Sequence, residues 1–126
     1  MDRCRHHPRD RGQATLEYLA FIPILLLVGL CGIQLGWAAY VVQQAETAAR
    51  TAARVEARKP GAGDAAGRDA IKDSLGTAAE ISVQRSSDAV TVTVRLPVKS
   101  IVPGVGNGFT ERTATMPDDD PEGPRP

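Results

Sequence analysis

The chain of 126 residues lacks residue types on which many enzymes and disulfide-stabilised proteins depend. Beyond residue 31 it contains no cysteine and no histidine. Serine and threonine nucleophiles would therefore have no histidine base in this region, and a disulfide framework cannot form there. No glycine-rich phosphate-binding loop follows a strand pattern. We therefore predict that the protein is not an enzyme and uses no cofactor.

Signals for metal or nucleic-acid binding are also weak. Cys4, His6 and His7 lie close together near the N-terminus, but no second cluster of ligands accompanies them. The acidic residues near the C-terminus lack the spacing of a calcium-binding loop, which favours a solvated tail. No basic run with interleaved aromatic residues occurs beyond the first twelve residues. We predict neither a metal site nor a nucleic-acid partner.

Charge is absent from residues 19–42, where Gln34 is the one clearly polar side chain. As a helix rising about 1.5 Å per residue, this run spans roughly 36 Å, enough for a hydrocarbon core of about 30 Å. Tyr18 and Trp37 are placed like interfacial aromatic residues at its two ends. The pattern predicts one membrane-spanning helix. A secretory signal cut near residues 36–38 is the alternative, although the run is longer than the apolar part of such signals.

Beyond the apolar run the helix is expected to continue to residue 59, because good helix formers dominate and no Gly or Pro occurs before Pro60. Small residues recur at helical spacing in both parts. They are Gly29, Gly32 and Gly36 in the apolar run, and Ala45, Ala49 and Ala53 beyond it. Small residues let helices approach closely in lipid, so these positions are candidates for packing against other subunits. The alanines would equally suit contact with this chain's own small domain.

The region 60–116 has the pattern of a small α+β domain outside the membrane. Pro60 and the glycines after it end the long helix, and a second helix is expected from about residue 64 to residue 80, with Asp64 as its N-cap. The period then changes to two, which predicts a small antiparallel sheet of two to three strands.

The strands differ in how clearly the pattern defines them. Strict alternation from Val90 to Val98 predicts a half-buried strand, paired in a hairpin with a shorter strand around Ile81 and Val83. A third strand is expected over residues 109–116. Residues 117–126 are acidic and rich in proline, and are predicted to form a disordered tail.

The start of the long helix resembles the processing site of type IV prepilins. A leader of residues 1–12, which carries four arginines, ends at Gly12, and Glu17 is the fifth residue after that glycine. The continuation is similar to TadE-like minor pseudopilins of tight-adherence (Flp) pilus systems. The matching features are Glu17 with Tyr18, Pro23, the glycines Gly29 and Gly36, Tyr40, and the Ala/Arg-rich stretch 45–54.

This resemblance covers roughly residues 11–58 and departs from the family pattern in two respects. Trp37 stands where arginine is frequent, and the exported part has no cysteine. Neither departure removes a feature that processing requires. The remainder of the chain carries no motif that identifies a binding role.

The resemblance implies cleavage between Gly12 and Gln13 by a prepilin peptidase on the cytoplasmic side, with the C-terminal domain outside the cytoplasm. Lys and Arg residues lie on both sides of the apolar run, so their count alone leaves the orientation open. The implied partners are that peptidase, other pilins or pseudopilins, the pilus assembly platform and membrane lipid. The alternatives are an unprocessed, membrane-anchored envelope binding module and a secreted protein.

Glu17 is the charge that this resemblance explains. The resemblance implies that the Glu17 carboxylate pairs with the new terminal amine of a neighbouring subunit. It also implies that Tyr18 belongs to the same assembly motif. From the residues alone, the simpler interpretation is an interfacial glutamate near a helix N-terminus, where the helix dipole favours a negative charge.

Overall fold

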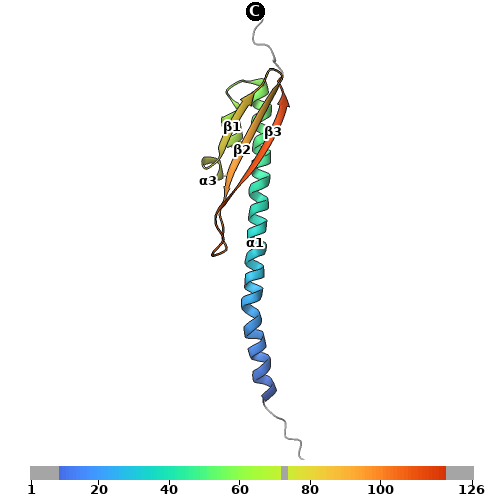
Figure 1. Ribbon diagram of the computed structural model, residues 1–126, viewed down its shortest axis with the longest axis vertical. Helices are drawn as coiled ribbons and strands as arrows, with labels where there is room; N and C mark the ends of the chain where they lie inside the picture. The colour runs from blue at the N-terminus through green and yellow to red at the C-terminus, as the bar shows by residue number, and fades with distance from the viewer. Residues whose placement is uncertain (1–8, 72–73, 119–126) are drawn as a thin grey trace, which may run out of the picture.

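One helix runs nearly the full length of the molecule, and the other elements lie beside its C-terminal half (Figure 1). The computed structural model describes residues 9–71 and 74–118. In chain order the elements are α1 (Arg9–Arg58), α2 (Gly63–Ala70), α3 (Ser74–Thr77), β1 (Glu80–Arg85), β2 (Ala89–Val98) and β3 (Gly108–Pro117). The predicted α+β class, with a long N-terminal helix and a small antiparallel sheet, is confirmed.

The helix α1 is continuous over 50 residues, and Pro23 is the one proline inside it. At about 1.5 Å per residue it is roughly 75 Å long. It ends at Arg58, one residue before the predicted limit. Pro60 follows, and Gly61 turns the chain with a positive φ of 88°, a conformation that favours glycine.

The sheet has the strand order β1-β2-β3, with both neighbouring pairs antiparallel. The predicted turn at residues 86–88 joins β1 to β2, and the Ser86 N–H donates to the Ala89 carbonyl at 2.8 Å. The outer face of the sheet is polar. There the hydroxyls of Thr91 and Thr115 pair across β2 and β3 at 3.1 Å. The alternation of β2 therefore separates an apolar inner face from a polar outer face, as predicted.

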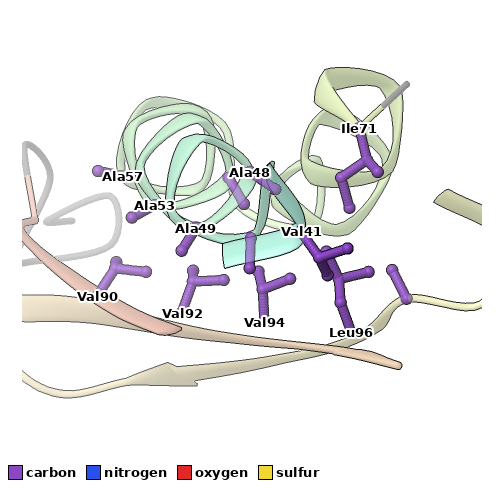
Figure 2. Packing of buried hydrophobic residues seen from close by; sticks show 13 residues of the cluster. Val41, Ala48, Ala49, Ala53, Ala57, Ile71, Val90, Val92, Val94 and Leu96 are labelled. Carbon is purple, nitrogen blue, oxygen red and sulfur yellow. The ribbon is translucent and has the colours of Figure 1, made fainter. Parts of the chain in front are cut away.

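The core lies between the inner face of β2 and the alanines of α1 (Figure 2). Val90, Val92, Val94 and Leu96 are fully buried. They face a helix surface made chiefly of alanine, with Val41 as its most N-terminal buried residue. Burying each of the four β2 side chains stabilises the fold by about 1.5–3 kcal/mol. Because alanine is small, the sheet can lie close to the helix backbone.

The helical region after Pro60 is shorter and more divided than predicted. Its first helix, α2, ends at Ala70, and Ile71 is extended with φ −92° and ψ 127°. The Arg68 guanidinium donates to the carbonyls of Gly76, at 3.4 Å, and Ala79, at 2.8 Å, so it ties α2 to the chain around α3. These hydrogen bonds stabilise a turn of the chain in place of the continuous helix that the sequence pattern predicts over residues 64–80.

The predicted N-cap role of Asp64 is wrong. Ala62 is the N-cap residue of α2 and makes no side-chain cap, whereas Asp64 lies in the first turn and pairs with Arg68 at 3.3 Å. The Glu56 side chain supplies the cap instead. Its Oε2 accepts the Gly63 N–H at 2.8 Å, so a carboxylate from α1 satisfies a buried donor at the start of α2 that has no partner within the helix.

Glu56 is also the centre of a buried polar network. Its Oε1 accepts the Gly61 N–H at 2.8 Å, and Arg85 donates to the Glu56 main-chain carbonyl at 2.8 Å. Burial raises the pKa of Glu56, but the hydrogen bonds from Gly61, Gly63 and Arg85 together hold it below its ordinary value. The network joins the end of α1 to the loop before α2 and to β1.

The network continues to the end of β3. Arg85 Nη1 lies 2.6 Å from Oδ2 of Asp118, whose side chain is buried. Pro117 and Asp118 were predicted to belong to the disordered tail, and this boundary is wrong because β3 extends through Pro117 and Asp118 pairs with Arg85. The remainder of the predicted tail, residues 119–126, lies outside the described residues.

Candidate functional site

The N-terminal half of α1 is an apolar surface that the rest of the described chain leaves almost entirely uncovered. We call residues 12–36 the bare segment. Leu30 is half-buried, whereas its other large apolar side chains are each at least 51% exposed: Leu16, Tyr18, Leu19, Phe21, Ile22, Ile24, Leu25, Leu26, Leu27, Val28, Ile33 and Leu35. A continuous apolar surface of this kind is characteristic of contact with lipid or another protein. The helix is long and apolar enough to cross a membrane.

The glycines of the bare segment are not required by the chain's own packing. A Cβ added at Gly29, Gly32 or Gly36 would meet nothing within 4 Å. The glycines of α2 differ: a Cβ at Gly63 would lie 2.8 Å from the Glu56 Cβ, and one at Gly67 would lie 2.8 Å from the Ile81 Cδ1. Glycine is therefore needed inside the domain for close contact, whereas along the bare segment the space beside each glycine is open.

The open glycines and the domain lie on opposite sides of α1. At roughly 100° of rotation per residue, Gln34, which contacts the domain, is about 160° from the centre of the three glycines. The side of α1 that carries the glycines continues toward the C-terminal end of the helix through exposed polar residues, namely Gln43, Thr47, Arg50 and Arg54. One face of α1 is therefore left uncovered along both halves of the helix.

The residues of the predicted processing and assembly motif lie within the first turns of α1. Gly12, Gln13, Glu17 and Tyr18 are all exposed, and a Cβ on Gly12 would meet no atom within 4 Å. In the described part of the chain, no hydrogen bond or ion pair involves the Glu17 carboxylate. The structure thus places these four residues together on bare helix and leaves the carboxylate accessible to a partner.

The alanines of the predicted packing stripe have a different environment. Ala45, Ala49 and Ala53 are no more than 1% exposed, and they lie under this chain's own sheet. Of the two roles that the sequence left open for them, the structure shows contact with the protein's own domain. We call residues 41–58, which carry these alanines, the packed segment.

One polar residue of the apolar run has a specific role that sequence reasoning missed. Gln34 Nε2 donates to the Lys99 carbonyl at 3.3 Å, and its Oε1 accepts the Ile101 N–H at 2.6 Å. Its amide thus attaches the loop between β2 and β3 to α1. The signal in the sequence was a lone amide within an otherwise apolar helix, since a buried or lipid-facing polar group needs a partner.

The model of a family described as TadE-like protein matches residues 12–54. Over these residues the chain is similar to TadE-like proteins. The matched region contains the whole bare segment and most of the packed segment, so it includes both the apolar surface and part of the domain's core. The match supports an association with tight-adherence (Tad) pilus systems. No curated protein and no solved structure matches the chain.

The matched helix offers no group of side chains suited to metal chemistry in the part of the chain that the structure describes. Among those residues, no group of three or more His, Cys, Asp or Glu side chains could hold a metal ion. The candidate site is therefore a surface for association: the bare segment, with Glu17 near its beginning and an open line of glycines along one side.

Proposed function

We propose that the protein is a TadE-like pilus assembly protein or minor pseudopilin that α1 anchors in the cell membrane. Its N-terminus lies in the cytoplasm, and the domain formed around the packed segment lies outside. The observation that carries this proposal is the bare segment itself, an apolar helix similar to TadE-like proteins that its own domain leaves almost entirely uncovered. Its work is structural, through helix contacts with other pilins or pseudopilins and the assembly platform.

Processing by a prepilin peptidase is proposed at the Gly12–Gln13 bond. Neither packing nor a positive φ requires glycine at position 12, so the fold does not explain this residue. A glycine lowers helix stability by about 1 kcal/mol relative to alanine, which eases the local unwinding that a peptidase needs to reach the bond. Cleavage would remove four arginines and two aspartates, leaving 11 basic and 13 acidic side chains and a formal charge of −2.

The same cleavage supplies a partner for Glu17. It creates an α-amine on Gln13, and an amine of this kind on a neighbouring subunit could approach the exposed Glu17 carboxylate. A carboxylate near the lipid core costs a few kcal/mol, depending on its depth. An opposite charge in this poorly screened environment offsets that cost. Pairing between subunits therefore favours assembly of processed chains.

The N-terminus of the mature protein tests the processing step. We expect the intact mass of the protein purified from membranes to correspond to a chain that begins at Gln13. An unprocessed N-terminus would support a simple membrane anchor, and a start near residue 39 would indicate secretion. Either result contradicts the proposal.

The role of Glu17 is tested by Glu17→Ala, with Glu46→Ala as a matched control. Glu46 is an exposed glutamate of the same helix, in the packed segment. We expect both variants to be cleaved, Glu17→Ala to lose fibre production or incorporation, and Glu46→Ala to retain it. Normal assembly of the Glu17→Ala variant would rule out the pairing.

A further inference from the structure

The loop between β2 and β3, residues 99–107, carries an exposed apolar tip. Ile101 is 48% exposed and Val105 57% exposed. No charged residue occurs from Ser100 to Thr110, whereas Lys99 stands exposed at the base of the loop. The loop is thus an uncharged apolar tip with a cation at its edge, a composition suited to the boundary between lipid tails and headgroups.

The tip has a defined conformation. Pro103 and Gly104 form its turn, with a positive φ of 84° at Gly104 and a hydrogen bond of 3.3 Å from the Val105 N–H to the Val102 carbonyl. These are the features of a type II turn. The Ser100 N–H donates to Asn107 Oδ1 at 2.9 Å, which closes the loop at its base. Internal bonds of this kind lower the cost of placing backbone near lipid.

The position of the loop along α1 is the deciding observation. From the sheet the loop extends along α1 toward its N-terminal end (Figure 1), and the Gln34 amide holds it through Lys99 and Ile101. Gln34 lies roughly 26 Å along the helix from Glu17. A hydrocarbon core is about 30 Å thick, so Gln34 lies about 4 Å short of its outer edge when Glu17 lies at its inner edge.

We propose that residues 101–105 insert into the outer interface of the same bilayer that α1 crosses. The loop then forms a second membrane contact, and Gln34 sets its depth by tying it to the helix. The domain would lean on the membrane surface instead of standing clear of it, with the turn at residues 86–88 at the distant end. This inference rests on the proposed membrane anchoring and adds a lipid-binding surface outside the matched TadE-like region.

Fluorescence of a polarity-sensitive probe on single cysteines tests this insertion. The full chain carries Cys4→Ser and Cys31→Ser, and the environment-sensitive dye NBD is attached through Val105→Cys, Ser87→Cys or Leu26→Cys. All three positions are exposed in the structure. Each protein is reconstituted in phosphatidylcholine–phosphatidylglycerol vesicles that contain lipid spin-labelled near the headgroup or deep in the acyl chain.

We expect the probe at position 105 to show blue-shifted emission and quenching by the shallow spin label. The probe at position 26 should be quenched most by the deep label, and the probe at position 87 by neither. Quenching at position 26 with none at position 105 would overturn the insertion while leaving the anchor intact. Absence of quenching at position 26 would refute the anchor and the insertion together.

A neighbouring copy of the chain is the competing cover for this loop. In that case the probe at position 105 would be blue-shifted without lipid quenching, and the shift would fade as the protein is diluted into excess lipid. That outcome would also overturn the proposal. A shift that persists on dilution, together with shallow quenching, supports contact with lipid.

Discussion

The bare segment and the packed segment belong to one helix and both place small residues at regular helical intervals, yet they use them differently. In the packed segment the alanines are covered by the chain's own sheet. In the bare segment the space beside each glycine is open. Small residues at helical spacing therefore indicate that something approaches the helix closely, but they do not say whether the neighbour belongs to the same chain.

The difference arises from what each half can bury. β2 has four fully buried apolar side chains, and these share one core with the alanines of the packed segment. The sheet then ends, and further toward the N-terminus of α1 Trp37 packs against the core and the Gln34 amide holds the loop between β2 and β3. The bare segment consequently depends on its surroundings, whereas the packed segment is stabilised within the chain.

The largest difference should appear when the same substitution is made in each region. Leu96→Ala removes a fully buried side chain from the core, and we expect it to destabilise the domain by about 2–5 kcal/mol. Leu26→Ala removes a side chain that is 68% exposed and should leave domain stability unchanged. Denaturant unfolding in detergent can be followed through Trp37, the sole tryptophan, which packs against the core. Equal effects of the two substitutions would contradict the division of α1.

Replacing small residues by larger ones tests the same difference between the packed and the bare segment. Ala49→Leu inserts volume under the sheet and should cost the domain about 1–3 kcal/mol. Gly32→Leu points into open space and should leave unfolding unaffected, while weakening association of the protein with its partner helices in membranes. Chemical cross-linking in membranes measures the association. If Gly32→Leu destabilises the domain as much as Ala49→Leu, the bare segment has an internal contact that this account lacks.

The Glu56 network should make the packed region sensitive to pH. Because the folded state lowers the pKa of Glu56, its contribution to stability is present above the unfolded pKa and is lost as the pH falls through the lower, folded value. Glu56→Gln should cost about 1–3 kcal/mol at neutral pH. Its stability should also fall less than that of the wild type between neutral and acidic pH. Parallel pH profiles for the two proteins would show that the Glu56 charge contributes nothing.

The smallest effect is expected on the exposed side of the packed segment. Glu46 and Arg50 form an ion pair one helical turn apart, with side chains 48% and 68% exposed. Glu46→Gln should cost about 0.2–0.5 kcal/mol, and added salt should abolish the difference from the wild type. A larger or salt-independent loss in denaturant unfolding would mean that this face also belongs to the core.

Local patterns were sufficient to predict much of the fold. The absence of Gly and Pro between residues 37 and 59 predicted the continuous helix, and the alternation of β2 predicted both its strand and its buried face. These predictions succeeded because period and propensity act within a few residues. The predicted helix over residues 64–80 failed because Arg68 binds carbonyls eight and eleven residues further along the chain. The boundary at residues 117–118 failed because Asp118 pairs with Arg85, 33 residues before it.

The candidate site was predictable in its residues but less so in its surroundings. Gly12, Glu17 and the apolar run could be recognised from their spacing. The burial of the alanines, in contrast, depends on a sheet whose strands lie much further along the chain. Glu56 carried a signal that could have been used, since a charged residue occupies a position of the alanine face, four residues after Ala52. Only the fold shows that the N–H groups of Gly61 and Gly63 and the Arg85 guanidinium pair with the Glu56 carboxylate.

The division of α1 is tested most directly by labelling cysteines in intact membranes. Cys31 lies exposed in the bare segment, and Thr47→Cys places a thiol on an exposed position of the packed segment. In a Cys4→Ser background, a membrane-impermeant maleimide should not label Cys31 until detergent dissolves the bilayer. With Cys31 also replaced by serine, the Thr47→Cys variant should be labelled from the outer face without detergent. Labelling of Cys31 in intact membranes as fast as that of the Thr47→Cys variant would contradict the account.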